Sequence, residues 1–175
     1  HLPIALAPDG GIAERHCFSG CCAIAADGTP TLLYTRIGLA SLLSMARRGA
    51  DQCAAFGDAE LVAWSKHPGN PVLRESVHRG ARIRHWRDPY VFRDAGDWYL
   101  VLAGLEPGEP AGSVLLYRSQ TLLDWEYRGR LASGDPSLDR GIECPNYFQV
   151  GDRWALLVSP YGPVRYRVGG FQGER

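Results

Sequence analysis

Two acidic residues in similar local sequences have the types and spacing that could do chemistry. Asp88 lies in RDP at 87–89 and Glu143 in ECP at 143–145, and each is followed by a proline and an apolar run. A single acid before such a run is most often a solvated or turn-forming group. Two acids at matching positions can instead face one another across a cavity, as glycoside hydrolysis requires. Asp88 and Glu143 are therefore candidate catalytic residues.

Both acids head copies of a repeated unit, which suggests how they are positioned. Each copy has a polar head, an apolar run, a tight turn with Gly and Asp, and a second apolar run. The three copies are residues 18–35, 87–104 and 143–160. A second unit, in which an aromatic residue precedes Leu and then Trp three residues later, recurs around Trp64 and Trp125. A period in the fifties to sixties with about four strands is typical of β-propeller blades.

The pattern of the whole chain favours an all-β fold. Short apolar runs bounded by Gly, Pro and Asp predict antiparallel strands. The clearest are at 31–35, 98–102, 113–117 and 154–158. Only 39–48 has a helix-like pattern. The 175 residues supply about three propeller blades, and an ordinary β-sandwich is the alternative. In a propeller, the innermost strands would bring Asp88 and Glu143 into one funnel.

The composition is balanced. The chain has 19 Lys and Arg, 19 Asp and Glu, and 45% hydrophobic residues. This gives no electrostatic case for a nucleic-acid or membrane partner. No apolar stretch reaches the roughly 18 residues of a spanning helix. The chain begins with His1 and shows no signal-like segment, so we expect it to be cut from a longer protein.

The cysteines do not form a recognisable metal or disulfide pattern. There are five, an odd number, and their spacing fits no common zinc template. Their positions are Cys17, Cys21, Cys22, Cys53 and Cys144. Small buried thiols are the commoner outcome, so no metal or other cofactor is expected.

The sequence resembles glycoside hydrolase family 32 in an ordered set of three short segments. They are FSG at 18–20, RDP at 87–89 and ECP at 143–145. This family contains invertases, levanases and inulinases, and its catalytic domain is a five-bladed β-propeller. Residues 52–73 are similar to its linking strands, and 166–171 to its Tyr-x-x-Gly-x-Phe strand. The resemblance implies that residues 1–175 are a partial catalytic propeller, which lacks the first-blade nucleophile motif and the last blade or blades.

The resemblance also implies roles for individual residues. Glu143 would be the general acid/base, and Asp88 would stabilise the transition state. Arg87 would orient the substrate and keep Asp88 ionised. Phe18 and Ser19 would border the fructosyl subsite. The implied partner is a fructose-containing oligo- or polysaccharide, and the polymer-degrading members of the family favour an extracellular location.

Several positions depart from the family pattern or are open to two interpretations. The family's nucleophile is the aspartate of an Asn-Asp-Pro motif, which this sequence lacks; Asp9 lies upstream of Phe18 but in a different context. We therefore expect the 175 residues alone to be inactive. Cys21 replaces the second Ser of Phe-Ser-Gly-Ser, which changes one hydrogen-bonding group. Trp86 is either a stacking surface for sugar or a core tryptophan.

Two other functions remain open at this point. Glycoside hydrolase family 43 has five-bladed propellers that cleave arabinosides and xylosides with inversion, and it has a similar RDP segment. A non-catalytic carbohydrate-binding propeller would retain the funnel without the nucleophile. The ECP and FSG segments favour family 32 over family 43, and the intact Arg87, Asp88 and Glu143 favour an enzyme.

Overall fold

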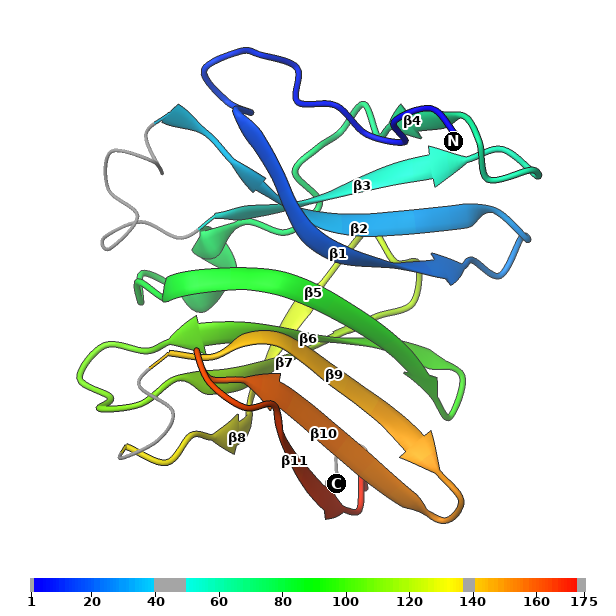
Figure 1. Ribbon diagram of the computed structural model, residues 1–175. Coiled ribbons are helices and arrows are strands. Elements are labelled where there is room, and N and C mark those ends of the chain that lie inside the picture. The colour runs from blue at the N-terminus through cyan, green and yellow to red at the C-terminus, as the bar shows by residue number, and fades with distance from the viewer. Residues whose placement is uncertain (1, 40–49, 137–140, 173–175) are drawn as a thin grey trace.

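The computed structural model describes residues 2–39, 50–136 and 141–172, and within these ranges the chain folds into three antiparallel β-sheets (Figure 1). The first sheet has the strand order β1-β2-β3-β4, the second β5-β6-β7-β8, and the third β11-β10-β9. The strands are β1 (His16–Ile24), β2 (Pro30–Ile37), β3 (Asp51–Gly57), β4 (Trp64–Lys66), β5 (Arg84–Asp94), β6 (Asp97–Leu105), β7 (Ser113–Ser119), β8 (Glu126–Ser133), β9 (Glu143–Val150), β10 (Arg153–Ser159) and β11 (Arg165–Gly169). A short 3-10 helix, η1 (Glu75–His78), precedes β5.

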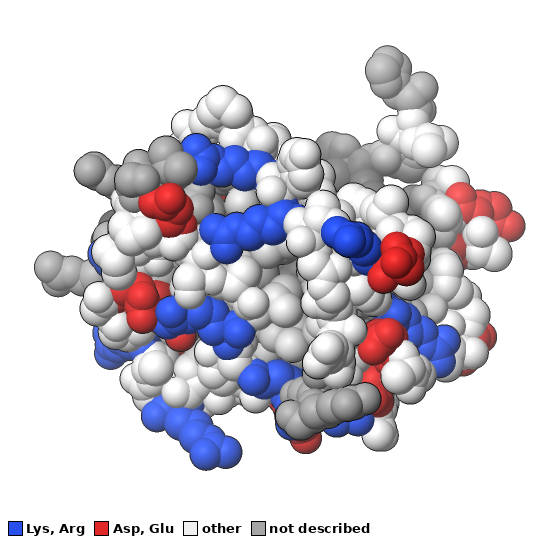
Figure 2. Space-filling model, turned by 90° about the horizontal axis from the view of Figure 1, so that it is seen from below, with Lys and Arg blue, Asp and Glu red and all other residues white. Residues whose placement is uncertain are grey.

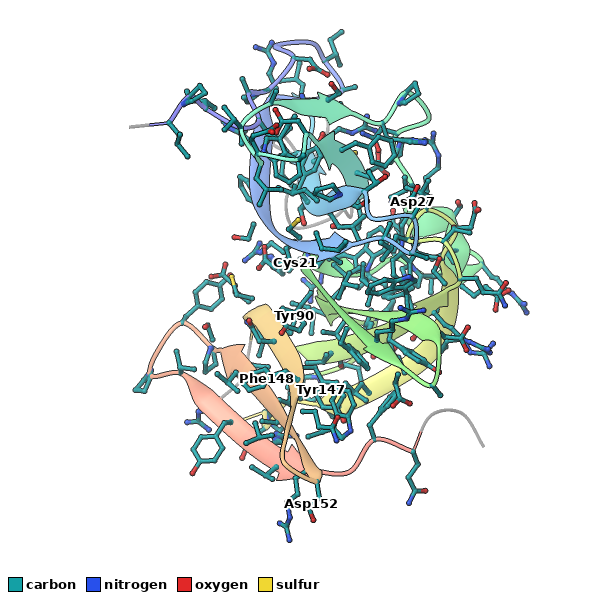
Figure 3. All side chains as sticks on the ribbon, turned by 90° about the vertical axis from the view of Figure 1, so that its right-hand side faces the viewer. Cys21, Asp27, Tyr90, Tyr147, Phe148 and Asp152 are labelled. Carbon is teal, nitrogen blue, oxygen red and sulfur yellow. The ribbon has the colours of Figure 1, made fainter. Side chains whose placement is uncertain are left out.

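The sheets follow one another in space as they do in sequence. Strand β5 lies against β1 on one side and against β9 on the other, so the first strands of the three sheets are neighbours (Figure 1). Figure 3 shows this succession from the side, with Cys21 of β1, Tyr90 of β5 and Phe148 of β9 one after another. The all-β prediction is confirmed, and the three sheets correspond to the three predicted blades rather than to a two-sheet sandwich.

The second sheet is the centre of the structure. From Trp98 to Leu105, every residue of β6 is buried, because the other two sheets cover its two faces. One core cluster, which includes Leu33, Trp86 and Leu100, joins the first and second sheets. A second cluster, which includes Phe92 and Trp154, joins the second and third. Burial of this apolar surface is the main stabilising contribution to the fold.

All four runs predicted as strands lie in strands, and the tryptophan repeat corresponds to a repeated turn. Leu61 and Leu122 both adopt positive φ, at 57° and 68°. Each backbone carbonyl accepts a hydrogen bond from the indole of the tryptophan three residues later, at 3.1 Å for Trp64 and 3.0 Å for Trp125. The helix-like run at 39–48 lies outside the described residues except for Leu39. No helix among the described residues is long and apolar enough to cross a membrane.

The innermost strands share an irregularity that the repeat did not reveal. The pairing register shifts between Cys17 and Gly20 on β1, and between Arg87 and Tyr90 on β5. On the third sheet it shifts between Leu157 and Ser159 of β10, opposite the start of β9. Bulges of this kind release residues from the ladder and redirect their side chains. The segments FSG at 18–20, RDP at 87–89 and ECP at 143–145 are called the signature segments below. They therefore leave the regular ladders at equivalent places.

Gly20 is required by the bulge in β1. A Cβ atom added there would lie 2.0 Å from the carbonyl oxygen of Leu33. We expect Gly20→Ala to lower the free energy of unfolding by about 2 kcal/mol or more, because the backbone of β2 would have to move. Urea denaturation measures this. Gly11→Ala is the control, since a Cβ there has no neighbour within 4 Å; equal effects of the two changes would contradict the packing argument.

Candidate active site

The two acids predicted to be catalytic lie on adjacent inner strands and are joined by Arg87. Its guanidinium Nη2 donates to Oε1 of Glu143, and its Nε lies 3.6 Å from Oδ2 of Asp88. Nη2 also donates to the Tyr161 hydroxyl at 2.8 Å. Arg87 is buried, with 9% of its surface exposed, so its charge needs these partners. One buried cation thus holds two carboxylates from neighbouring sheets.

The backbone around Asp88 is specialised. Asp88 has a φ of 64°, which non-glycine residues seldom adopt. Its amide N–H donates to the Thr35 hydroxyl at 2.9 Å, and its Oδ2 accepts the amide N–H of Cys144 at 3.0 Å. Cys144 also has a positive φ, of 45°. Asp88 therefore contacts all three sheets through Thr35 on β2, its own strand β5 and Cys144 on β9.

Burial decides the electrostatics of Asp88. The side chain is 6% exposed, and this desolvation raises the pKa of the Asp88 carboxyl above its ordinary value. The Cys144 N–H and the Arg87 guanidinium act in the opposite direction, and Glu143 adds to the rise. We predicted that Arg87 keeps Asp88 ionised; its charge does favour the ionised form, but burial is the larger effect.

The head of β1 completes the group. Phe18 is 36% exposed, and Ser19 is exposed with its hydroxyl 3.8 Å from Sγ of Cys144. The thiol of Cys144 also lies 3.6 Å from Oδ2 of Asp88. Cys21, which stands where the family has Ser, accepts the amide N–H of Val91 at 3.1 Å. This hydrogen bond connects β1 to β5.

Trp86 is a core residue, and the prediction that it contacts sugar is wrong. Its side chain has no exposed surface, and its indole N–H donates to the Tyr117 hydroxyl at 2.8 Å. The His78 ring packs edge-on against it, with centroids 5.0 Å apart. Trp86 belongs to the core cluster that joins the first and second sheets, so the core alternative was correct.

Three polar residues of this region had no sequence signal that we used. Tyr161, in the loop after β10, reaches Arg87 from 74 positions away. Thr35 on β2 and Gln52 on β3 are fully buried and hydrogen-bonded to one another at 2.8 Å. A polar residue inside an apolar run, such as Gln52 in DQCAAFG, is the feature that could have indicated a buried role.

Two further acids and a hollow next to the third sheet lie away from this site. Asp9 and Glu14 both pair with Lys66 on β4, so Asp9 is engaged at the far edge of the first sheet. The described ranges contain no group of three or more His, Cys, Asp or Glu side chains arranged to hold a metal ion. A hollow of about 410 Å³ between the second and third sheets, lined partly by Val114 and Leu156, includes neither carboxylate.

The surface seen from below has no continuous charged area. Basic side chains are spread singly over it, several next to acidic ones, with uncharged residues between them (Figure 2). Within the site, Arg87 forms ion pairs with both Asp88 and Glu143. Three propeller-like sheets with paired carboxylates at their inner strands are the features of a propeller-type glycosidase.

Comparison with known families identifies the class more closely. Residues 1–173 match the model of the glycosyl hydrolases family 32 N-terminal domain. The chain therefore belongs to glycoside hydrolase family 32. This membership decides against family 43 and confirms the resemblance that rests on the FSG, RDP and ECP segments.

Curated relatives and solved structures agree. The chain is 33% identical over 171 residues to sucrose-6-phosphate hydrolase of Escherichia coli, covering 93% of this chain and 32% of the relative. It is 32% identical to the raffinose invertase of Escherichia coli, covering 95% of this chain and 34% of that protein. The chain spans about a third of the length of the curated relatives that it matches.

Among solved structures, fructan 1-exohydrolase IIa from Cichorium intybus superposes with a TM-score of 0.78 at 25% identity, over 98% of this chain and 34% of that one. The GH32 beta-fructofuranosidase of Bombyx mori superposes with a TM-score of 0.77 at 29% identity, over 97% of this chain and 36% of that one. These similarities confirm the five-bladed propeller type, with about three blades present in this chain.

The raised pKa of Asp88 predicts a pH-dependent stability. The folded-state pKa lies above the unfolded value of about 3.9, so the wild type gains stability as pH falls through the folded pKa. Asp88→Asn cannot titrate and has no such gain. The unfolding free energy of the variant minus that of the wild type should therefore decrease from pH 7 to about pH 4 in chemical denaturation.

Asp27 provides a control of opposite sign. Hydrogen bonds from Thr29 lower the pKa of its exposed carboxyl, so the wild type loses stability as this group is protonated. The unfolding free energy of Asp27→Asn minus that of the wild type should therefore increase as pH falls. The same direction of change for both variants would contradict the assignment for Asp88.

Proposed function

We propose that this chain forms part of the active site of a retaining β-fructofuranosidase that hydrolyses terminal β-D-fructofuranosides. The observation that carries the proposal is the pairing of Asp88 and Glu143 through buried Arg87, on adjacent inner strands. Relatives named for sucrose-6-phosphate hydrolysis, raffinose inversion and fructan exohydrolysis support a fructose-containing saccharide as substrate. The substrate panel is therefore sucrose, its 6-phosphate, raffinose, inulin and levan.

Glu143 is the proposed general acid/base. Its side chain is 34% exposed, so it can contact substrate while its Oε1 accepts from Arg87. It protonates the glycosidic oxygen as the bond to the leaving sugar breaks, and the resulting carboxylate later takes a proton from the attacking water. Because Oε1 of Glu143 already accepts a hydrogen bond from Arg87, the other carboxyl oxygen, Oε2, is the one assigned to proton transfer.

Asp88 is the proposed transition-state stabiliser. Its contacts with Cys144 and Arg87 are all made by Oδ2, which leaves Oδ1 as the acceptor for a sugar hydroxyl in this proposal. Such a hydrogen bond strengthens as the ring gains oxocarbenium character. The positions of Phe18 and Ser19 at the head of β1 support the proposal that they border the fructosyl ring. Arg87 orients the carboxylates of Asp88 and Glu143.

The nucleophile is proposed to come from outside these 175 residues. A retaining mechanism needs a carboxylate about 5 Å from the acid/base to form the covalent fructosyl intermediate. In the family this is the aspartate of Asn-Asp-Pro, and the sequence has no such motif. Asp9 is paired with Lys66 at 2.6 Å, and Asp88 is committed to Cys144 and Arg87.

Glu143→Gln tests the acid/base role in the complete gene product that contains these residues. The kcat/KM for sucrose should fall by about 10²- to 10⁴-fold, because the leaving alkoxide is no longer protonated. A p-nitrophenyl fructoside should lose far less in its bond-cleavage step, since its leaving group needs no proton. Glu126→Gln, at an exposed position on β8, is the control. Equal losses on both substrates would contradict the role.

The 175 residues alone are expected to be inactive, since the second carboxylate of the retaining pair is missing. Release of fructose from sucrose or inulin by the purified 175-residue chain is the measurement, with the complete gene product assayed beside it. Turnover by the chain at enzyme-like rates would show that the nucleophile lies within it. An inactive complete gene product that still binds fructosides would favour the carbohydrate-binding alternative.

A further inference from the structure

A closed chain of buried hydrogen bonds connects the first sheet to the backbone on both sides of Arg87. Thr35 and Gln52 are directly opposite one another on β2 and β3. The Thr35 hydroxyl accepts the amide N–H of Asp88, and the Gln52 amide reaches the carbonyl oxygen of Trp86 at 3.2 Å. Residues 86 and 88 flank Arg87, so the two links hold its backbone from both directions.

The donor and the acceptor of each of these hydrogen bonds are determined. Gln52 faces two carbonyl oxygens, of Trp86 and Ala50, so its NH2 group must point toward them. Its Oε1 then accepts from the Thr35 hydroxyl, whose proton is used there at 2.8 Å. The Thr35 oxygen can therefore only accept from Asp88. Thr35 and Gln52 both have no exposed surface, so water does not compete for these bonds.

The segment that these bonds hold is otherwise unfavourable. His85 and Asp88 have φ angles of 53° and 64°, and non-glycine residues in this region are strained and persist only where the surroundings enforce them. The pairing register also shifts on both sides of Arg87, so regular ladder bonds to β6 do not fix residues 86 and 88, although Arg87 itself pairs with Ala103. The bonds from Thr35 and Gln52 replace them.

We propose that Thr35 and Gln52 are positioning residues, which set the directions of the Asp88 and Arg87 side chains through the backbone of residues 86–88. They touch no substrate themselves. Because Arg87 also holds Glu143, both acids depend on the same backbone segment. This inference rests on the proposed function, and it assigns a role in the reaction to two residues of the first sheet that lie outside the signature segments.

Thr35→Val tests the inference in the complete gene product, because valine keeps the shape but removes the hydroxyl. The kcat for sucrose should fall by roughly 10- to 100-fold with KM changed by less than about threefold, since small misplacements of catalytic groups affect the transition state most. Thr35→Ser keeps the hydroxyl and should stay within about threefold of the wild type. Equal activity of the two variants would overturn the inference.

A double-mutant cycle separates positioning from general destabilisation. In an Asp88→Asn background, Thr35→Val should lower kcat by a smaller factor than it does in the wild type, because one of the groups that it positions is already disabled. Full additivity of the two losses would overturn the inference. Hydrogen exchange gives a readout without activity: the Asp88 amide should exchange faster in Thr35→Val than in Thr35→Ser, and unchanged protection would equally overturn it.

Gln52→Glu provides a second variant should the valine variant fail to fold. An ionised carboxylate there would face the Trp86 and Ala50 carbonyls, whereas a protonated one restores a donor. Activity relative to the wild type should therefore fall as pH rises and recover as pH falls; a constant ratio would overturn the inference. A wild-type gene product without fructosidase activity would instead overturn the proposed function, while the exchange measurement would still report on the hydrogen bonds.

Discussion

The structure of the site depends on the buried guanidinium of Arg87. A cation with 9% exposure must be compensated, and here the compensation comes from Asp88 beside it, from Glu143 on the next sheet and from the Tyr161 hydroxyl. The same cation reduces the repulsion that two neighbouring carboxylates would otherwise experience. The pairing of the two acids through Arg87 is thus also a polar contact between the second and third sheets.

The inner strands supply this arrangement through a repeated departure from regular β-structure. Each of the three sheets shifts register where its signature segment lies. The bulges turn Ser19, Asp88 and Cys144 toward one another, and the positive φ angles of the last two are the conformational cost of that geometry. Bonds from Thr35 and Cys144 offset part of this cost at Asp88. The apolar clusters on either side of β6 keep the sheets in fixed relation.

Much of this was predictable from local pattern, and the remainder depended on contacts between distant residues. The hairpin repeat predicted the strands and the matched positions of Asp88 and Glu143, because period-two alternation and turn residues act locally. Trp86 was misassigned because its neighbours in sequence are site residues, whereas its side chain is buried in the core cluster of the first and second sheets. Thr35, Gln52 and Tyr161 could not be connected to Asp88 or Arg87 without the packing of the sheets. The direction of the Asp88 pKa likewise depends on burial, which the RDP motif does not report.

We propose that Asp88 and Glu143 act together on one fructosyl unit held between them. The most direct measurement is a crystal structure of the complete gene product carrying Glu143→Gln, with sucrose bound. We expect hydroxyls of the fructosyl ring to lie within hydrogen-bond distance of the Asp88 carboxylate. We also expect the glycosidic oxygen to lie within the same distance of the side chain at position 143. Sucrose bound elsewhere, or with neither side chain in contact, would contradict it.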